Sequence, residues 1–150
     1  MNDITKVSES ILESLNKLSS SLVADNFRYY NSNPNKNKTS DCVVRSISTA
    51  LNKSWEDVLK ELTEYALKHK HFPNCQEIYE IYLKDNKWKK HNAPHKRNGD
   101  VYLLGEWLKK FGDEAIVTID DDHLTYVNNH IVYDIWNCTE NEVGVFWTEK

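Results

Sequence analysis

The sequence predicts an α+β domain, in which helices come first along the chain and an antiparallel sheet follows. Two observations lead to this fold class. Apolar side chains recur at helical spacing between residues 42 and 111, whereas short β-branched and aromatic segments separated by polar turns occupy residues 115–147. A chain of 150 residues is long enough to bury one sizeable hydrophobic core, so we expect a single main domain.

An amphipathic helix is predicted over residues 3 to about 24. Its apolar side chains recur every three or four residues, at Ile4, Val7, Ile11, Leu15, Leu18 and Leu22. The Asn-rich loop 31–37 follows and is the best candidate boundary. We therefore expect an N-terminal amphipathic helix or arm over residues 1–30 and a domain over residues 31–150. Packing of this helix on the domain is favoured, and an interaction arm is the alternative.

Four further helices are predicted from end signals and apolar periodicity. Asp41 or Ser40 is placed to cap the first, Ser54 the second and Asp100 the fourth, while Gly112 is placed to end the fourth. Together with the third helix, which has no such signal, they cover residues 42–51, 55–66, 76–84 and 101–111.

The strand-like segments cover residues 115–119, 123–127 and 131–136, and a last strand includes Val143, Val145 and Trp147. The turn between the second and third segments allows two registers. A turn at residues 128–129 places His123 directly opposite Asp134. A turn at residues 129–130 makes Asp134 diagonal to His123, on the same face, with Trp136 opposite. Both registers allow the histidine and the acid to meet.

Cys42 stands where a loop becomes a helix. A buried cysteine often serves as a small hydrophobic residue, but a helix N-terminus stabilises a thiolate. His123 and Asp134, taken alone, are also compatible with an ordinary cross-strand pair. The order of thiol, histidine and acid is nevertheless that of a papain-like cysteine hydrolase, in which a thiolate attacks, an imidazole exchanges protons and a third group orients the imidazole. The three residues together therefore predict a nucleophilic site.

Three segments of the chain, DCVVRSI at 41–47, HLTYV at 123–127 and IVYDIW at 131–136, resemble a group of small papain-like proteins of bacteriophages and bacteria. The resemblance covers roughly residues 39–150 and implies a papain-like cysteine hydrolase fold. In that class an Asn or Asp orients the catalytic histidine, and a Trp two residues later often shields the contact. The resemblance thus implies catalytic Cys42, His123 and Asp134, with Trp136 as the shield.

The same resemblance implies an oxyanion donor several residues before the cysteine, for which Asn35 and Asn37 are the candidates. The implied reaction is hydrolysis of a peptide-like bond by a peptidase, isopeptidase or amidase that needs no cofactor and no metal. The implied location is the cytoplasm of a bacterium or a phage-infected host. One departure is Asp122, where the class favours a small residue. The acidic run 120–122 either raises the pKa of His123 or forms a solvated turn, and the turn is favoured.

Composition limits the partners. A formal net charge of −4 argues against a nucleic-acid binder, and no apolar run approaches the length of a membrane span. The three cysteines, at 42, 75 and 138, lack zinc-like spacing, so reduced thiols are expected. We expect a peptide or protein substrate and neither membrane nor nucleic acid as a partner, and the oligomeric state is left open.

Two groups of side chains can be interpreted either as ordinary solvated residues or as binding sites. The first, favoured as solvated rather than metal-binding, consists of His69, His71, His91 and His95 with Cys75. The second is the basic segment 84–97, favoured as a solvated loop and helix end rather than a phosphate-contacting patch. The alternative function is a catalytically silent papain-like module that binds a host or phage protein through the leading helix or this basic segment.

Overall fold

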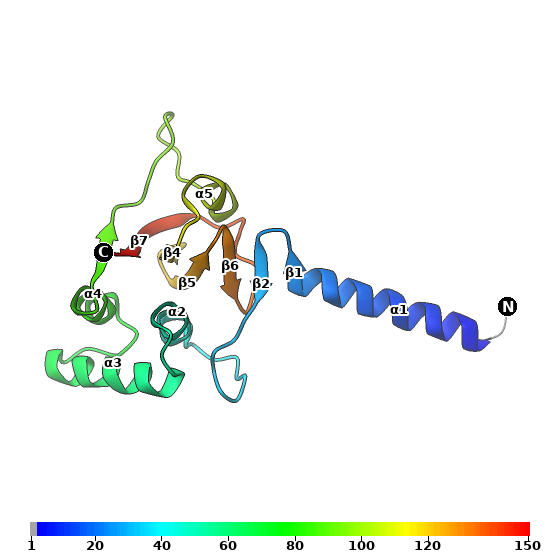
Figure 1. Ribbon diagram of the computed structural model, residues 1–150, viewed down its shortest axis with the longest axis horizontal. Coiled ribbons are helices and arrows are strands. Elements are labelled where there is room, and N and C mark those ends of the chain that lie inside the picture. The colour runs from blue at the N-terminus through cyan, green and yellow to red at the C-terminus, as the bar shows by residue number, and fades with distance from the viewer. Residues whose placement is uncertain (1–2) are drawn as a thin grey trace.

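The computed structural model describes residues 3–150, so residues 1 and 2 of the predicted arm lie outside the described residues (Figure 1). The described chain is a mixed α+β structure, which confirms the predicted class. Its helices are α1 (Asp3–Leu22), α2 (Cys42–Leu51), α3 (Trp55–His69), α4 (Gln76–Asp85) and α5 (Leu104–Phe111). Its strands are β1 (Val23–Ala24), β2 (Phe27–Tyr29), β3 (Trp88–His91), β4 (Ala115–Ile119), β5 (His123–Asn128), β6 (Ile131–Asp134) and β7 (Val143–Glu149).

The strands form one sheet in the order β1-β2-β6-β5-β4-β7-β3. All neighbours are antiparallel except β2 and β6, which run parallel, so the expectation of a purely antiparallel sheet is wrong at this pair. The physical reason is chain order. Parallel neighbours need a long crossover, and the segment that contains α2 to α5 separates β2 from β6 and supplies it.

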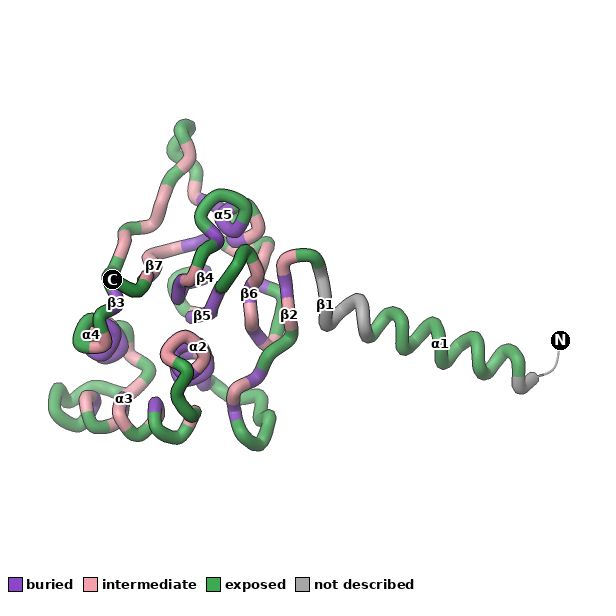
Figure 2. The backbone as a smooth tube through the Cα atoms, in the orientation of Figure 1, coloured by how far each residue is buried: buried purple, intermediate pink, exposed green. Residues whose placement is uncertain are grey.

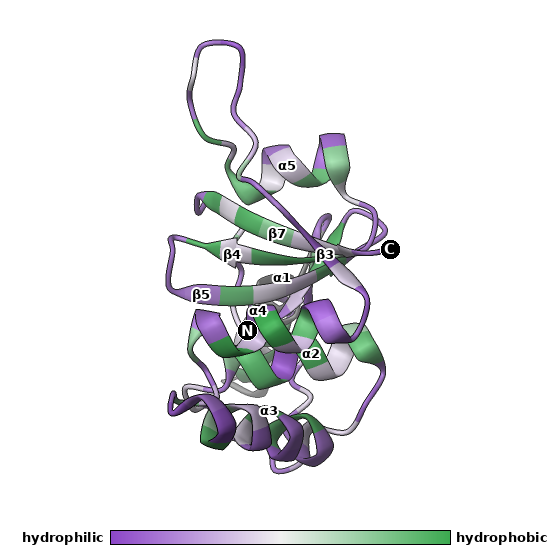
Figure 3. Ribbon diagram, turned by 90° about the vertical axis from the view of Figure 1, so that its left-hand side faces the viewer, coloured by the Kyte–Doolittle hydropathy of each residue, from purple (hydrophilic) through white to green (hydrophobic). Residues whose placement is uncertain are grey.

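Helices cover both faces of the sheet (Figure 3). On one face, α5 buries Trp107 against strand residues that include Val117 and Val127. On the other face, α2 and α4 pack through residues such as Ile47 and Ile78, and α3 forms a further layer beyond them. The sheet is therefore the common wall of two hydrophobic cores, and α2, which carries Cys42, is held tightly against it.

Helix α1 projects away from this layered body (Figure 1), and its described surface is exposed (Figure 2). Five apolar residues of α1 each have an exposed fraction between 55% and 59%: Val7, Ile11, Leu12, Leu15 and Leu18. The side chains of Ile4 and Leu22 lie outside the described residues. The structure therefore presents α1 as an arm, and the favoured expectation that it packs on the domain is wrong.

Local signals place most of the helices correctly. Ser54 accepts a hydrogen bond from the Asp57 N–H at 3.1 Å and caps α3, and Gly112 follows the end of α5, both as predicted. The start of α5 differs, because it begins at Leu104 rather than after Asp100. The intervening residues Val101 and Leu103 are extended and form isolated bridges with other segments, which delays the helix.

Strands β1, β2 and β3 are absent from the predicted elements, and β1 takes the last two residues of the predicted leading helix, where it pairs with β2. Strand β3 lies inside the basic segment 84–97, which was expected to be a solvated loop and helix end. The reason is tertiary, because pairing with β7 buries Trp88 to 4% exposure between exposed lysines. Within the described residues, none of the helices is both long and apolar enough to cross a membrane.

Candidate functional site

Cys42 is the first residue of α2, at the end of α2 that meets the start of β5. Of the two predicted caps, Asp41 and Ser40, Asp41 occupies the N-cap position of α2. Its side chain makes no capping hydrogen bond. The carboxylate instead accepts from Arg45 Nε at 2.8 Å, Asn33 Nδ2 at 3.1 Å and Trp55 Nε1 at 3.0 Å. The residue before the thiol is therefore fixed from three directions, which holds the start of α2 in place.

The β5–β6 hairpin adopts the second of the two predicted registers. Its turn residues Asn129 and His130 have φ values of 49° and 63°, as the favoured two-residue hairpin turns require. Tyr126 pairs with Tyr133, and the register continued by one residue puts Thr125 opposite Asp134. His123 is then diagonal to Asp134 and on the same face.

Asp134 forms the centre of the site. Its Oδ2 lies 2.6 Å from His123 Nε2 and accepts from Thr125 Oγ1 at 2.6 Å. Its Oδ1 accepts from Arg45 Nη1 at 3.0 Å and from the Ile135 N–H at 2.7 Å. Burial of this carboxylate, which is 1% exposed, would raise its pKa. The donors, His123 foremost, outweigh burial and lower the pKa of Asp134, so the group is an anion that is fully hydrogen-bonded.

The tautomer of His123 follows from these contacts. A carboxylate can only accept, so His123 Nε2 carries the proton shared with Asp134, and Nδ1 remains for the thiol of Cys42. Burial would lower the pKa of His123, but the hydrogen bond to Asp134 and then the contact with Cys42 outweigh it and raise the pKa to about 9. The imidazole is therefore easily kept as a cation.

The pKa of Cys42 is shifted in the opposite direction from that of His123. Burial of this half-buried thiol would raise its pKa, but the hydrogen bond with His123 and one from the Leu124 N–H outweigh burial. The pKa of Cys42 is therefore lowered. A thiol with a lowered pKa beside a histidine with a raised pKa favours a thiolate–imidazolium pair, which is the reactive form of a nucleophilic cysteine.

Arg45 connects the two acids of the site. Its side chain is buried, with its residue 6% exposed, and it bridges Asp41 on the loop side and Asp134 on β6. Burial would lower the pKa of Arg45, but the two carboxylates outweigh it and raise the pKa, so the cation is permanent. Sequence reasoning included Arg45 in the motif without assigning a role. The available signal was a cation three residues after the thiol, between apolar Val44 and Ile47.

Thr125 and Trp136 complete the surroundings of the histidine. Thr125 was missed by sequence reasoning, although strand alternation places it on the face of His123, two residues further along β5. Trp136 lies where the resemblance implies a shield, with its ring centroid 5.1 Å from that of His123 and tilted by 52°. It is 40% exposed, so it covers one side of the imidazole while it remains open to solvent.

Asn35 and Asn37 lie exposed on the loop before α2. Their hydrogen bonds run through the main chain, because the Asn35 N–H donates to Asn33 Oδ1 at 3.0 Å and the Asn37 carbonyl accepts from Asn31 Nδ2 at 3.1 Å. Within the described residues neither side chain makes a hydrogen bond. The buried amides of this loop are instead Asn31 and Asn33. The assignment of Asn35 and Asn37 as oxyanion donors stays a prediction.

A cleft of about 190 Å³ adjoins His123. Residues from several elements line it, among them Val43, Asn74, Gln76, Tyr79, Asp121 and Asp122. Its wall is largely polar and includes two carboxylates of the acidic turn. The main contributions that raise the pKa of His123 come from Asp134 and Cys42, which is consistent with the acidic run as a solvated turn.

The histidines that the sequence favours as solvated rather than metal-binding are only partly brought together. His71 and Cys75 are close, together with Glu77, but His91 stacks on Phe146 and contacts Thr148 Oγ1 at 2.7 Å.

A second close group consists of His123, Asp134 and Cys138. In that group burial and the charge of Asp134 raise the pKa of Cys138 to about 12, so the thiol stays protonated, and Asp134 already holds the guanidinium of Arg45. This second group therefore suits hydrogen bonding better than metal ligation. All three cysteines are free thiols.

No protein family, curated protein or solved structure matches this chain in comparisons of sequence and of fold.

Proposed function

We propose that this protein is a papain-like cysteine hydrolase that cleaves a peptide-like bond, as a peptidase, isopeptidase or amidase. The observation that carries the proposal is the line of hydrogen bonds from Cys42 through His123 to the buried carboxylate of Asp134. This line supplies a nucleophile, a general acid–base and an orienting group in the order that acyl transfer requires.

The proposed reaction has two stages. First, the Cys42 thiolate attacks the carbonyl carbon of the substrate, and the imidazolium of His123 gives its proton to the leaving nitrogen as the C–N bond breaks. A thioester and a free amine result. Second, neutral His123 takes a proton from a water molecule, which attacks the thioester. A carboxylic acid leaves, and the thiolate–imidazolium pair is restored.

Asp134 acts in this scheme through the imidazole. Its contact with Nε2 fixes the tautomer, so Nδ1 always faces the sulfur. Arg45 and Thr125 keep this carboxylate ionised and oriented, and we therefore assign both as positioning residues. The acidic cleft beside His123 is the proposed entry for the substrate carbonyl.

Two further features support a papain-like fold and setting. The nucleophile begins a helix that packs on a sheet, and the histidine and acid lie on adjacent strands of that sheet. The sequence resemblance to small papain-like proteins of phages and bacteria agrees with this order of elements. As part of the proposal, we place the protein in the cytoplasm of a bacterium or phage-infected host.

The test is cleavage of a degenerate peptide library, read by mass spectrometry of new termini. We expect the wild-type chain to cleave some of these peptides, Cys42→Ala to lose the activity, and Cys75→Ala, which removes another half-buried thiol, to retain it. Full turnover by Cys42→Ala on a confirmed substrate would contradict the mechanism.

A second candidate function is a catalytically silent module that binds a host or phage protein. The exposed apolar face of α1 favours it, because such a face is a typical docking surface for a partner helix. The reactivity of Cys42 separates the two functions, because a binding module has no need for a thiol of lowered pKa.

A further inference from the structure

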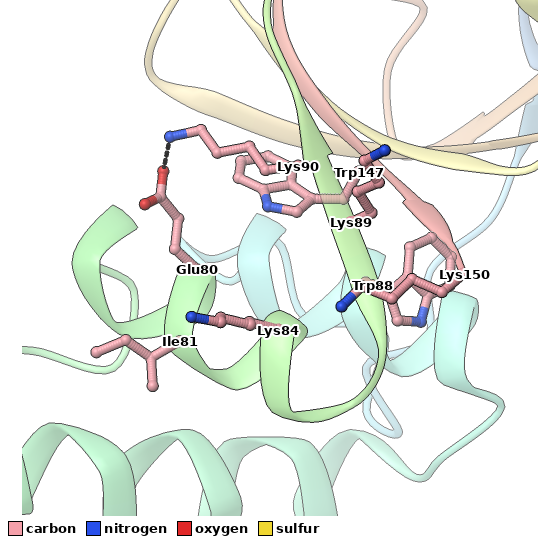
Figure 4. A pocket seen from close by; sticks show the side chains of 8 residues that line it. All are labelled: Glu80, Ile81, Lys84, Trp88, Lys89, Lys90, Trp147 and Lys150. Atoms are coloured by element: carbon pink, nitrogen blue, oxygen red, sulfur yellow. Dashed lines mark hydrogen bonds and ion pairs between the residues drawn. The ribbon is translucent and has the colours of Figure 1, made fainter.

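A pocket of about 340 Å³ lies between α4 and β3, apart from the site around Cys42 (Figure 4). Four lysines, one glutamate and three apolar residues line it: Lys84, Lys89, Lys90, Lys150, Glu80, Ile81, Trp88 and Trp147. The volume falls within the range of pockets that hold ligands. Nothing in the proposed hydrolase mechanism uses this pocket.

The rim of the pocket has surplus positive charge. Lys90 forms an ion pair with Glu80, which is the only lining residue with an acidic side chain. Among the described residues, Lys84, Lys89 and Lys150 have neither an ion pair nor a side-chain hydrogen bond, and all three are exposed. The whole chain carries a formal charge of −4, so the positive charge around this pocket differs in sign from the net charge of the protein. The charge pattern therefore suits an anionic ligand.

The pocket also reaches an open edge of the sheet, because β3 is the last strand in the sheet order. The Lys150 N–H donates to the Lys87 carbonyl at 2.9 Å, which makes this a hydrogen-bonded pair of the β3–β7 ladder. Hydrogen-bonded pairs alternate along an antiparallel ladder. In the register of β3 with β7, the main-chain N–H and C=O groups of Trp88 and Lys90 therefore face away from β7.

Side-chain alternation shows that the pocket extends around this edge. Trp88 and Lys90 project from one face of β3, and Lys89 from the other. All three line the pocket, so the backbone of β3 must form part of its wall. A ligand in the pocket thus meets two outward-facing donors and two outward-facing acceptors beside an apolar floor and free lysines.

We infer that this pocket and the free edge of β3 bind an extended acidic peptide segment, which adds to the sheet as a strand. Hydrogen bonds to the main chain of Trp88 and Lys90 would hold its backbone, and its carboxylates would pair with Lys84 and Lys89. Its apolar side chains would pack over Ile81 and the tryptophan rings. The inference is independent of catalysis at Cys42.

An acidic peptide fits better than a nucleic acid for a specific reason. Bases bind single-strand sites by stacking on accessible aromatic rings. Trp88 and Trp147 are only 4% and 1% exposed, so they provide an apolar floor and no open ring face. The unpaired strand edge, in contrast, recognises a peptide backbone and not a phosphodiester chain.

The experiment is fluorescence polarisation at low ionic strength with a labelled nine-residue peptide that alternates Glu with Val or Thr. We expect saturable binding by the full chain that weakens as salt is added. The double variant Lys84→Glu/Lys89→Glu should weaken the affinity by about tenfold, because two attractive charge pairs become repulsive. The matched control Lys60→Glu/Lys68→Glu, on the exposed surface of α3, should leave it within about twofold.

A backbone-directed test separates strand addition from simple charge attraction. The same peptide with alternate amides N-methylated keeps its charges but cannot pair with a strand, so its binding should be lost. Lys90→Pro removes one outward N–H and should weaken binding more than Lys90→Gln, which removes only the side-chain charge.

Three results would overturn the inference. They are failure of the acidic peptide to bind at low salt, equal affinity of the N-methylated peptide, and preferential binding of a labelled single-stranded oligonucleotide at the same lysines. Because the N-methylated peptide leaves the protein unaltered, the test does not depend on the folding of any variant.

Discussion

Helices α1 and α2 are both amphipathic, yet the chain uses them in opposite ways. Helix α1 has an apolar stripe over 20 residues, and the described members of that stripe are more than half exposed. Helix α2 has only 10 residues, and six consecutive ones are buried, including a cation and two serines. Apolar periodicity therefore does not decide which of the two helices is buried in this molecule.

The difference lies in the partners available to each helix. Against the face of the sheet that it covers, α2 finds a partner for each of its buried polar side chains. Arg45 has two carboxylates, Ser46 donates to the Cys42 carbonyl at 2.6 Å, and Ser48 Oγ lies 2.8 Å from Ser32 Oγ. Buried polar groups are tolerated only when they are satisfied in this way. The described apolar side chains of α1 are instead more than half exposed, and such an exposed apolar face is typical of a surface that binds a partner.

The largest effect is expected from Arg45→Met. The substitution leaves the carboxylates of Asp41 and Asp134 buried without their cation, which typically costs about 3–5 kcal/mol. We expect the midpoint of urea unfolding to fall accordingly, whereas Lys60→Met on exposed α3 should change stability by less than about 0.5 kcal/mol. Equal effects of the two substitutions would show that the buried network does not stabilise α2.

The same substitution at one isoleucine of each helix tests the difference in burial between α1 and α2. Ile47→Ala on α2 removes a side chain with no exposed surface and should cost about 2–5 kcal/mol. Ile11→Ala on α1 makes the same chemical change at a 55% exposed position and should cost less than about 0.5 kcal/mol. Chemical unfolding of both variants measures the contrast. A large loss from Ile11→Ala would mean that α1 packs on the domain in solution.

Thr125→Val tests one donor of the network at nearly constant shape. It removes the hydroxyl that donates to Asp134 at 2.6 Å, and loss of a partner from a buried acceptor costs about 1–3 kcal/mol. The pKa of Asp134 should rise, since Thr125 is one of the groups that lower it. A lowered carboxyl pKa contributes stability that is lost as pH falls through the folded-state value. Acid unfolding of the variant should therefore begin at higher pH than in the wild type, and Thr125→Ser should behave like the wild type.

A change of pH perturbs the same network without altering any side chain. The folded-state pKa of His123 is raised to about 9 from 6.5. The protonated form therefore contributes stability that is fully present below pH 6.5 and is lost as pH rises through about 9. The difference in unfolding free energy between wild type and His123→Ala should shrink over that interval. NMR titration of the imidazole checks the same shift, and a pKa near 6.5 would contradict it.

The sequence was sufficient where local chemistry dominates. The strands around His123 and Asp134, the Ser54 cap and the end of α5 at Gly112 follow from residue pattern and turn preferences. The position of β3 did not follow, because only pairing with distant β7 buries Trp88. The exposure of α1 did not follow either, because amphipathicity indicates an apolar face without saying what covers it.

The residues of the candidate site also divide into those that the sequence indicates and those that only the structure reveals. The order of Cys42, His123 and Asp134 along the chain indicated a set of residues that the structure places in contact. The roles of Arg45 and Thr125 became visible only in three dimensions, since the Arg45–Asp134 contact joins residues 89 positions apart. The oxyanion donor is the least determined feature, because several asparagines fall in one loop and sequence spacing does not distinguish among them.

The most direct test of an activated Cys42 is its alkylation rate as a function of pH, read by mass spectrometry of the Cys42 peptide, in wild type and His123→Ala. If His123 activates Cys42, the rate titrates well below the pKa of about 8.5 of a free thiol, and the variant reacts more slowly with a higher apparent pKa. A slow reaction with an ordinary or raised pKa, unchanged by His123→Ala, would contradict an activated Cys42–His123 pair and favour the binding module.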